Sequence, residues 1–276
     1  MTKRILSGLT CLLLANSVFA LSQSSNLPFQ GAYIQGSLGI INANYKFPQQ
    51  TSALLDGGLE EAQTSSSSNY NYANDVMASL ALGYNQIFSN YVLGLVAKAS
   101  LTNAQVSTNI NVNSSGDHPE LPHEILNTNI KVTFKDNYSL LIKPGILLDN
   151  TTLLYFLLGP TWGYYKVSDQ ASFSHSILVT PPGTVYGING ATSSSSSGYK
   201  LGVTAGIGIE KYLSQKVGIG VEYDYAYFGH LASIASTGNI TTAAPGLGTI
   251  GTIHSQLNHV TLQTNAFMFN VFYNFS

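Results

Sequence analysis

The C-terminal segment, residues 265–275, constrains the fold more than any other part of the chain. Every second residue is aromatic or aliphatic, which gives one face made of Phe267, Phe269, Val271, Tyr273 and Phe275. The opposite face is mixed, with Ala266, Met268, Asn270, Phe272 and Asn274. Period-2 alternation indicates a β-strand, and about 9–11 such residues span the hydrocarbon of a bilayer. We therefore interpret the apolar stripe as the lipid face of a transmembrane strand.

The N-terminal segment has the pattern of a signal peptide. Lys3 and Arg4 precede an apolar stretch over residues 5–15, and Val18-Phe19-Ala20 offers small residues for cleavage after Ala20. The predicted domains are therefore a signal peptide over 1–20 and one outer-membrane β-barrel domain over 21–276. The single cysteine, Cys11, lies inside the predicted signal peptide and is poorly placed for lipid attachment.

Composition supports export to a membrane that is crossed by strands. After residue 20 no stretch approaches the ~18 continuous apolar residues of a transmembrane helix. Charged residues make up 9% of the chain, against about 25% in ordinary soluble domains. The predicted mature chain keeps nine lysines and 13 acidic residues, a net charge of −4. Such a surface argues against nucleic acid as a partner.

Eight segments combine an apolar face with a face of small or polar residues, as barrel strands do. They lie at about 32–43, 78–84, 91–100, 130–148, 154–164, 200–210, 217–225 and 266–275. In the fourth segment, every second residue from Ile130 to Leu148 is apolar, except for Asp136 and Pro144. This segment is about twice the length that a bilayer needs, so its first half is expected to project beyond the membrane.

The connections alternate between short and long. Three are tight, near Ser89, Asp149 and Ser214, and four are long, at about 44–75, 102–127, 168–197 and 229–256. Short periplasmic turns and long external loops are typical of outer-membrane barrels. The serine-rich loops are expected to be structureless, because they bury little apolar area. The predicted fold is all-β: an eight-stranded antiparallel transmembrane up-and-down β-barrel with long extracellular loops.

A soluble lipocalin-type barrel is the alternative architecture, with its apolar face turned inward around a ligand. Four charged residues, Lys98, Lys143, Glu222 and Asp224, share the faces that carry most of the glycines. These faces fit a crowded lumen, so the apolar faces must point outward. Counting from the tight turns places the four charges at similar height. We predict that Glu222 and Asp224 pair with Lys98 and Lys143 in a charged plug, since unpaired buried charges are costly.

Two segments resemble a known family. Residues 83–94, GYNQIFSNYVLG, look like the second hairpin of small opacity-type outer-membrane proteins, which are relatives of the outer-membrane protein A barrel. Residues 201–210 with 221–225 are similar to their penultimate hairpin. The resemblance covers essentially the whole mature chain and implies an outer-membrane barrel. It also implies that the C-terminal aromatic face (Phe267, Phe269, Val271, Tyr273, Phe275) is an assembly signal read by the barrel-assembly machinery, although Ser276 follows the terminal aromatic here. We expect no peptidoglycan-binding domain after the barrel, so the wall-anchoring role of the longer relatives is not carried over.

Candidate catalytic and metal sites are weak. An acidic, histidine-containing cluster lies in the second long loop, where prolines disfavour an aligning helix: Asp117, His118, Glu120, His123 and Glu124. His259-Val260-Thr261 resembles the His-x-Ser arrangement of outer-membrane lipid A deacylases, but threonine replaces the nucleophile and no acid orients His259. We therefore predict no enzyme activity, no catalytic residue, no metal and no cofactor.

Function must then follow from architecture, which permits several roles. The leading hypothesis is a surface-exposed structural or adhesin-like protein of a Gram-negative-type bacterium, acting through its four loops. The alternatives are a small passive porin-like channel and, with less support, a lipid-modifying enzyme. The expected partners are outer-membrane lipid and lipopolysaccharide, the barrel-assembly machinery, and host or environmental surface ligands.

Overall fold

The computed structural model describes residues 28–55, 63–114, 124–179, 184–231, 233–242, 248–257 and 260–275. The predicted signal peptide and Ser276 lie outside these residues. The described residues form ten strands: β1 (Gly31–Leu55), β2 (Gln63–Phe88), β3 (Tyr91–Ser114), β4 (Glu124–Asp149), β5 (Thr152–Val179), β6 (Thr184–Tyr212), β7 (Val217–His230), β8 (Ile234–Thr242), β9 (Thr249–Leu257) and β10 (Thr261–Asn274). This part of the chain has no helix that is long and apolar enough to cross a membrane.

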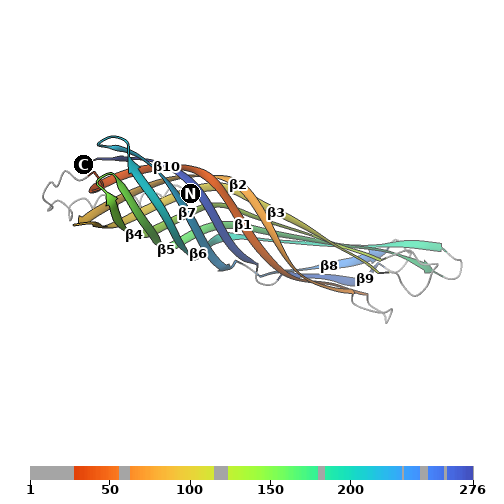
Figure 1. Cartoon of the computed structure of the whole chain (residues 1–276). Helices are drawn as coiled ribbons and strands as arrows, with labels where there is room; N and C mark the ends of the chain where they lie inside the picture. The colour runs from red at the N-terminus through yellow and green to blue at the C-terminus, as the bar shows by residue number, and fades with distance from the viewer. Residues whose placement is uncertain are drawn as a thin grey trace.

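Eight of the strands close into a ring of antiparallel pairs. The order β1-β2-β3-β4-β5-β6-β7-β10 returns to its start because β10 pairs with both β7 and β1 (Figure 1). A closed ring leaves no unpaired strand edge at membrane depth, where no water can satisfy the backbone. The predicted eight-stranded up-and-down barrel is thereby confirmed.

Apolar side chains cover the outside of the ring. On β10 the outward side chains, Phe267, Phe269, Val271, Tyr273 and Phe275, are 41–58% exposed. Their neighbours Ala266, Met268, Asn270, Phe272 and Asn274 point into the barrel and are buried. This alternation matches the outward apolar band of a barrel that faces lipid. The role of the outward face as an assembly signal stays a prediction.

Three tight turns lie at one end of the barrel, at the predicted places. Ser89 adopts a positive φ of 58° between β2 and β3. The Asp149 carboxylate accepts hydrogen bonds from the Thr151 hydroxyl (2.8 Å) and backbone N–H (2.6 Å). These bonds lower the pKa of Asp149 to about 2. In the third turn, the backbone N–H groups of Leu213 and Ser214 donate to the carbonyl of Val217.

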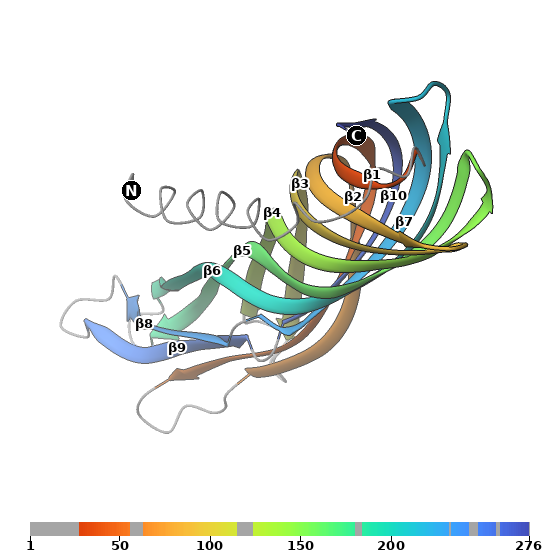
Figure 2. The same cartoon turned by 90° about the vertical axis from the view of Figure 1, so that its left-hand side faces the viewer.

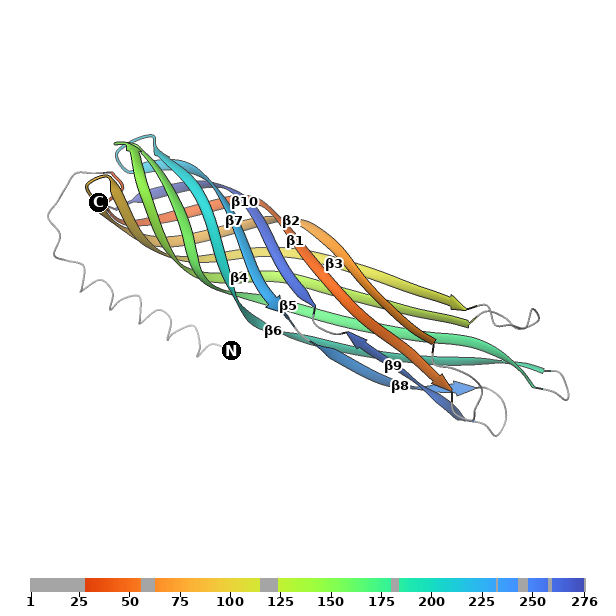
Figure 3. The ribbon, with the colours of Figure 1, turned by 60° about the horizontal axis from the view of Figure 1, so that its bottom comes forward.

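The prediction of four structureless external loops is wrong, because strands continue through most of these segments. β5 and β6 stay in register from Thr152↔Lys211 to Val179↔Thr184. At about 3.3 Å per residue, the 28 residues of β5 reach roughly 90 Å. The hydrocarbon core of a bilayer is only about 30 Å thick, so the strands extend well beyond it. Figure 3 shows β5 and β6 continuing past the ends of β7 and β10. We call the part of the barrel beyond the lipid-facing band the extracellular extension.

The fourth predicted loop, 229–256, is mostly a β-hairpin. β8 pairs with β6 from Ile188↔Thr242 to Gly190↔Ile240, and β9 pairs with β1 from Gln49↔Leu257 to Leu55↔Gly251. The hairpin takes the place between β6 and β1 that β7 and β10 occupy in the membrane (Figure 2). Inside the extension its isoleucines join a small core of Leu126, Ala171, Phe173, Ile188, Ile240 and Ile253.

The prediction that β4 has one continuous apolar face, pointing outward from Ile130 to Leu148, is also wrong. Tyr138, Leu140 and Ile142 face outward as expected, but Ile130, Val132 and Phe134 are buried inside the barrel. The β4–β5 register shifts between Phe134 and Asn137. Such a bulge adds a residue to one strand, so the apolar side chains beyond it point to the opposite face. The inward residues join the core of the upper barrel.

Candidate functional site

The candidate site is a network of charged side chains inside the barrel, which we call the lumen network. Its members are Lys98 on β3, Lys143 on β4, Tyr155 on β5, Glu210 on β6, and Glu222 and Asp224 on β7. All six are buried. Each occupies an inward position of the period-2 pattern, so the alternation that turns apolar residues to lipid also turns these charges to the lumen.

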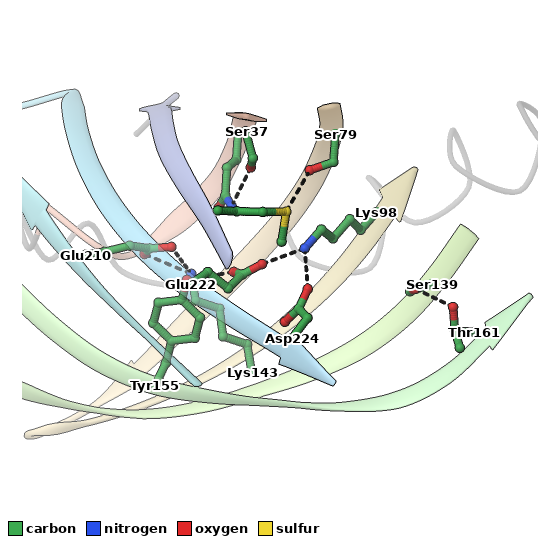
Figure 4. A network of polar contacts seen from close by, with 12 residues as sticks. Ser37, Ser79, Lys98, Ser139, Lys143, Tyr155, Thr161, Glu210, Glu222 and Asp224 are labelled. Atoms are coloured by element: carbon green, nitrogen blue, oxygen red, sulfur yellow. Dashed lines mark hydrogen bonds and ion pairs between the residues drawn. The ribbon is translucent and has the colours of Figure 1, made fainter. Parts of the chain in front are cut away.

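Lys98 lies between the two carboxylates of β7. Its Nζ is 2.5 Å from Glu222 Oε1 and 2.6 Å from Asp224 Oδ2 (Figure 4). Lys98 is 124 residues away from Glu222 in the sequence and 126 residues away from Asp224. The structure therefore brings together three of the four residues that the sequence analysis placed in the plug.

Lys143 has a different partner from the one predicted. Its Nζ donates to both carboxylate oxygens of Glu210, at 2.7 and 2.8 Å, and no ion pair joins it to Glu222 or Asp224 among the described contacts. Strands in a barrel are tilted and staggered, so residues at equal counts from their turns need not share a level. Lys143 also lies over the rings of Tyr155 (4.1 Å) and Tyr33 (4.7 Å).

Tyr155 connects the two ion-pair groups. Its hydroxyl donates to Glu222 Oε2 at 2.7 Å, while its ring lies under the Lys143 ammonium. Neither Tyr155 nor Glu210 was among the residues predicted from the sequence to form the charged plug. The signal for Glu210 was present, because it continues the inward glycine-rich face of β6. A Cβ at Gly208 would collide with the Tyr155 ring, so glycine is needed where this large side chain crosses the lumen.

The lumen is also filled on the side of the tight turns. The rings of Phe29, Tyr212 and Phe272 pack together with centroids 4.5–6.4 Å apart, Tyr212 lying edge-to-face with each of the other two. Asn274 fixes this group by donating to the carbonyls of Pro28 and Gln30 and to the Tyr212 hydroxyl. On the other side of the lumen network, a second buried cluster includes Phe134 and Phe228. An eight-stranded barrel is narrow enough for side chains to fill it, so this arrangement can obstruct a continuous water path.

The other sequence candidates do not form a site in the described part of the chain. Residues 117–123 and His259 lie outside the described residues. The Thr261 hydroxyl is 3.2 Å from Nδ1 of His230, on an exposed part of the barrel. Within the residues that the structure describes, no three His, Cys, Asp or Glu side chains are grouped to hold a metal ion.

The family model described as the outer membrane protein beta-barrel domain matches residues 11–275. No curated protein matches the chain. Among solved structures, the attachment invasion locus protein Ail of Yersinia pestis is 16% identical, with 88% of this chain and 98% of that chain covered at a TM-score of 0.32. OprG of Pseudomonas aeruginosa is 14% identical, with 91% and 100% covered at a TM-score of 0.37. Neisserial surface protein A is 11% identical, with 89% and 98% covered at a TM-score of 0.32.

Proposed function

Because the chain belongs to the outer membrane protein β-barrel family, we propose that it is a sealed outer-membrane barrel whose extracellular extension binds an uncharged, hydroxyl-rich partner such as a surface glycan. The protein resides in the outer membrane, as the family does. The finer role, an adhesin-like contact with a host or environmental surface, is carried by one observation: the strands continue far beyond the bilayer as an ordered sheet.

The outer surface of this extension has a groove of suitable chemistry. A hollow of about 600 Å³ crosses β4, β5, β6 and β8 and is lined mainly by amide and hydroxyl side chains: Asn127, Asn129, Gln170, Ser172, Thr192, Ser193 and Thr237. The strand registers align these groups in rows, Asn127↔Ser172 and Asn129↔Gln170↔Ser193. The volume lies within the range of ligand sites in proteins.

Among the described residues that line the groove none is charged, and this determines the kind of partner that we propose. Amides and hydroxyls can both donate and accept hydrogen bonds. They therefore complement a partner that carries many hydroxyls, whereas an acidic or basic partner would need opposite charges. Rigid strands also hold these groups in place, which lowers the entropy lost on binding. Membrane lipid remains the partner of the apolar band below.

We expect Ser193→Lys to abolish most of this binding, because it places a bulky charge in the groove. Ser195→Lys is the matched control, since Ser195 is exposed on the same face of β6, two residues away, and does not line the groove. Cells that display each variant are measured for adherence to a panel of immobilised glycans. Ser193→Lys should weaken adherence by about tenfold or more, which corresponds to ~1.4 kcal/mol, and Ser195→Lys should retain it. Equal adherence of the two variants, or no adherence of the wild type, would contradict the proposal.

A further inference from the structure

A small cavity adjoins the lumen network inside the barrel. Its volume is about 20 Å³. Its polar lining comes from Lys98 and Ser100 on β3, Asn137 and Ser139 on β4, Thr204 on β6, Asp224 on β7 and Thr264 on β10. A cavity of this size holds a single water-sized occupant. Figure 4 shows Lys98, Asp224 and Ser139 around this part of the lumen.

Three side-chain oxygens of residues that line the cavity have no hydrogen-bond partner among the described residues. They are Asp224 Oδ1, Thr204 Oγ1 and Asn137 Oδ1, and all three atoms are inaccessible to solvent. Thr204 and Asp224 are 4% and 8% exposed as whole residues. Buried polar atoms in native proteins almost always have a partner, so three unsatisfied oxygens around one cavity indicate an occupant.

The charges of the lumen network point to the nature of that occupant. The network contains two ammonium groups, Lys98 and Lys143, and three carboxylates, Glu210, Glu222 and Asp224. Lys143 engages Glu210, and Lys98 is shared between Glu222 and Asp224 Oδ2. Among the described residues of the lumen network, one negative charge therefore lacks a counter-charge, and Asp224, whose Oδ1 has no hydrogen-bond partner there, is one of the residues that line the cavity. An uncompensated buried charge is strongly unfavourable.

We propose that this cavity binds one small monovalent cation of the size of Na⁺, coordinated by Asp224 Oδ1, Thr204 Oγ1 and Asn137 Oδ1. A water molecule would satisfy the oxygens but leave the charge. A divalent ion would overcompensate the single excess charge. The bound cation would leave Asp224 bridging two positive charges, with Lys98 on Oδ2 and the cation on Oδ1. The inference rests on the lumen network and is independent of the partner proposed for the extracellular groove.

The stability of the full-length mature protein in detergent, measured by urea unfolding in NaCl and in choline chloride of equal concentration, tests this site. For the wild type we expect a Na⁺-dependent rise in the unfolding midpoint that saturates as a single site does. Asp224→Asn should abolish the response, and Thr204→Val should raise the half-saturating Na⁺ concentration at least tenfold. Thr161→Val is the control and should respond as the wild type does, since Thr161 is a fully buried lumen threonine that bonds Ser139 and does not line the cavity.

A wild type that unfolds identically in both salts, or an Asp224→Asn variant that keeps the Na⁺ response, would overturn the proposal. A protonated-carboxyl infrared band that disappears in Asp224→Asn would overturn it as well, because a proton would then neutralise the charge. If Asp224→Asn does not fold, the Thr204→Val variant decides the question. A half-saturating Na⁺ concentration raised at least tenfold supports the cation site, and a wild-type Na⁺ response in that variant overturns it.

Discussion

Lys98→Met is expected to lower the free energy of unfolding of the barrel by about 3–5 kcal/mol, the usual effect of removing one partner from a buried ion pair. Methionine keeps much of the length of the lysine side chain but has no charge. The carboxylates of Glu222 and Asp224, now 2.5 and 2.6 Å from Nζ, would then lie close together without an ammonium between them. Urea unfolding of the protein refolded in detergent or vesicles measures the loss.

The triple variant Lys98→Met, Glu222→Gln, Asp224→Asn is the informative control for this prediction. It removes both carboxylate charges together with the ammonium, so most of the lost stability should return. Lys216→Met removes a lysine from the exposed third turn and should change the stability little. If Lys98→Met unfolds at the same urea concentration as the wild type, the ion pairs of the lumen network do not contribute as described.

Phe269→Arg is expected to destabilise the inserted barrel by about 2–4 kcal/mol, the cost of a cationic side chain at the centre of the lipid face. Phe269 is half exposed on β10 and pairs with Leu38 on β1 and Val221 on β7, so apolar strands flank it on both sides. The folded fraction in lipid vesicles, read from the shift in gel mobility on heating, measures the effect.

Two controls show whether the effect comes from placing a charge in the lipid, from the charge alone, or from the loss of the phenylalanine ring. Phe269→Leu keeps an apolar side chain at the same place and should fold in nearly wild-type yield. Ser214→Arg puts the same charge on the exposed third turn, where water can solvate it, and should also fold. Equal folded yields of Phe269→Arg and Ser214→Arg would show that residue 269 does not face lipid.

The transmembrane part of this fold could be predicted because a bilayer imposes a simple pattern. The face of the barrel that contacts lipid must be apolar. Because side chains alternate between the two faces of a strand, every second residue of a membrane-spanning strand is therefore apolar. The outward residues of β10, such as Phe269 and Tyr273, and the inward charges Lys98, Glu222 and Asp224 were accordingly placed on the correct faces.

The extracellular extension was missed because the same rule does not apply outside the bilayer. Its strands face water, so serine and asparagine can occupy the outward positions and the sequence reads as loop. The residues that indicate order in this part of the chain are a few inward apolar side chains, including Phe173, Ile188 and Ile253. They form a hydrophobic core only when strands that are distant in the sequence come together. Apolar residues so widely spaced along the chain do not by themselves reveal a shared interior.

Local irregularity and barrel stagger account for the remaining errors. One bulge between Phe134 and Asn137 reversed the faces of β4, and nothing in the sequence distinguishes that bulge from a continuous strand. The pairing of Lys143 with Glu210 depends on how far adjacent strands are shifted along the barrel. Counting residues from each turn gives the face of a side chain but not its final height in the lumen.

Conductance of the purified protein in planar lipid bilayers shows whether the barrel is sealed. Three groups of side chains should together leave no continuous water path through the lumen. They are the buried ion pairs of Lys98 and Lys143, the aromatic cluster of Phe29, Tyr212 and Phe272, and the apolar cluster on the other side of the lumen network. Wild-type protein, once its insertion into the bilayer has been demonstrated, is expected to give no stepwise ion current. Steady ohmic channels in the wild type would contradict this expectation.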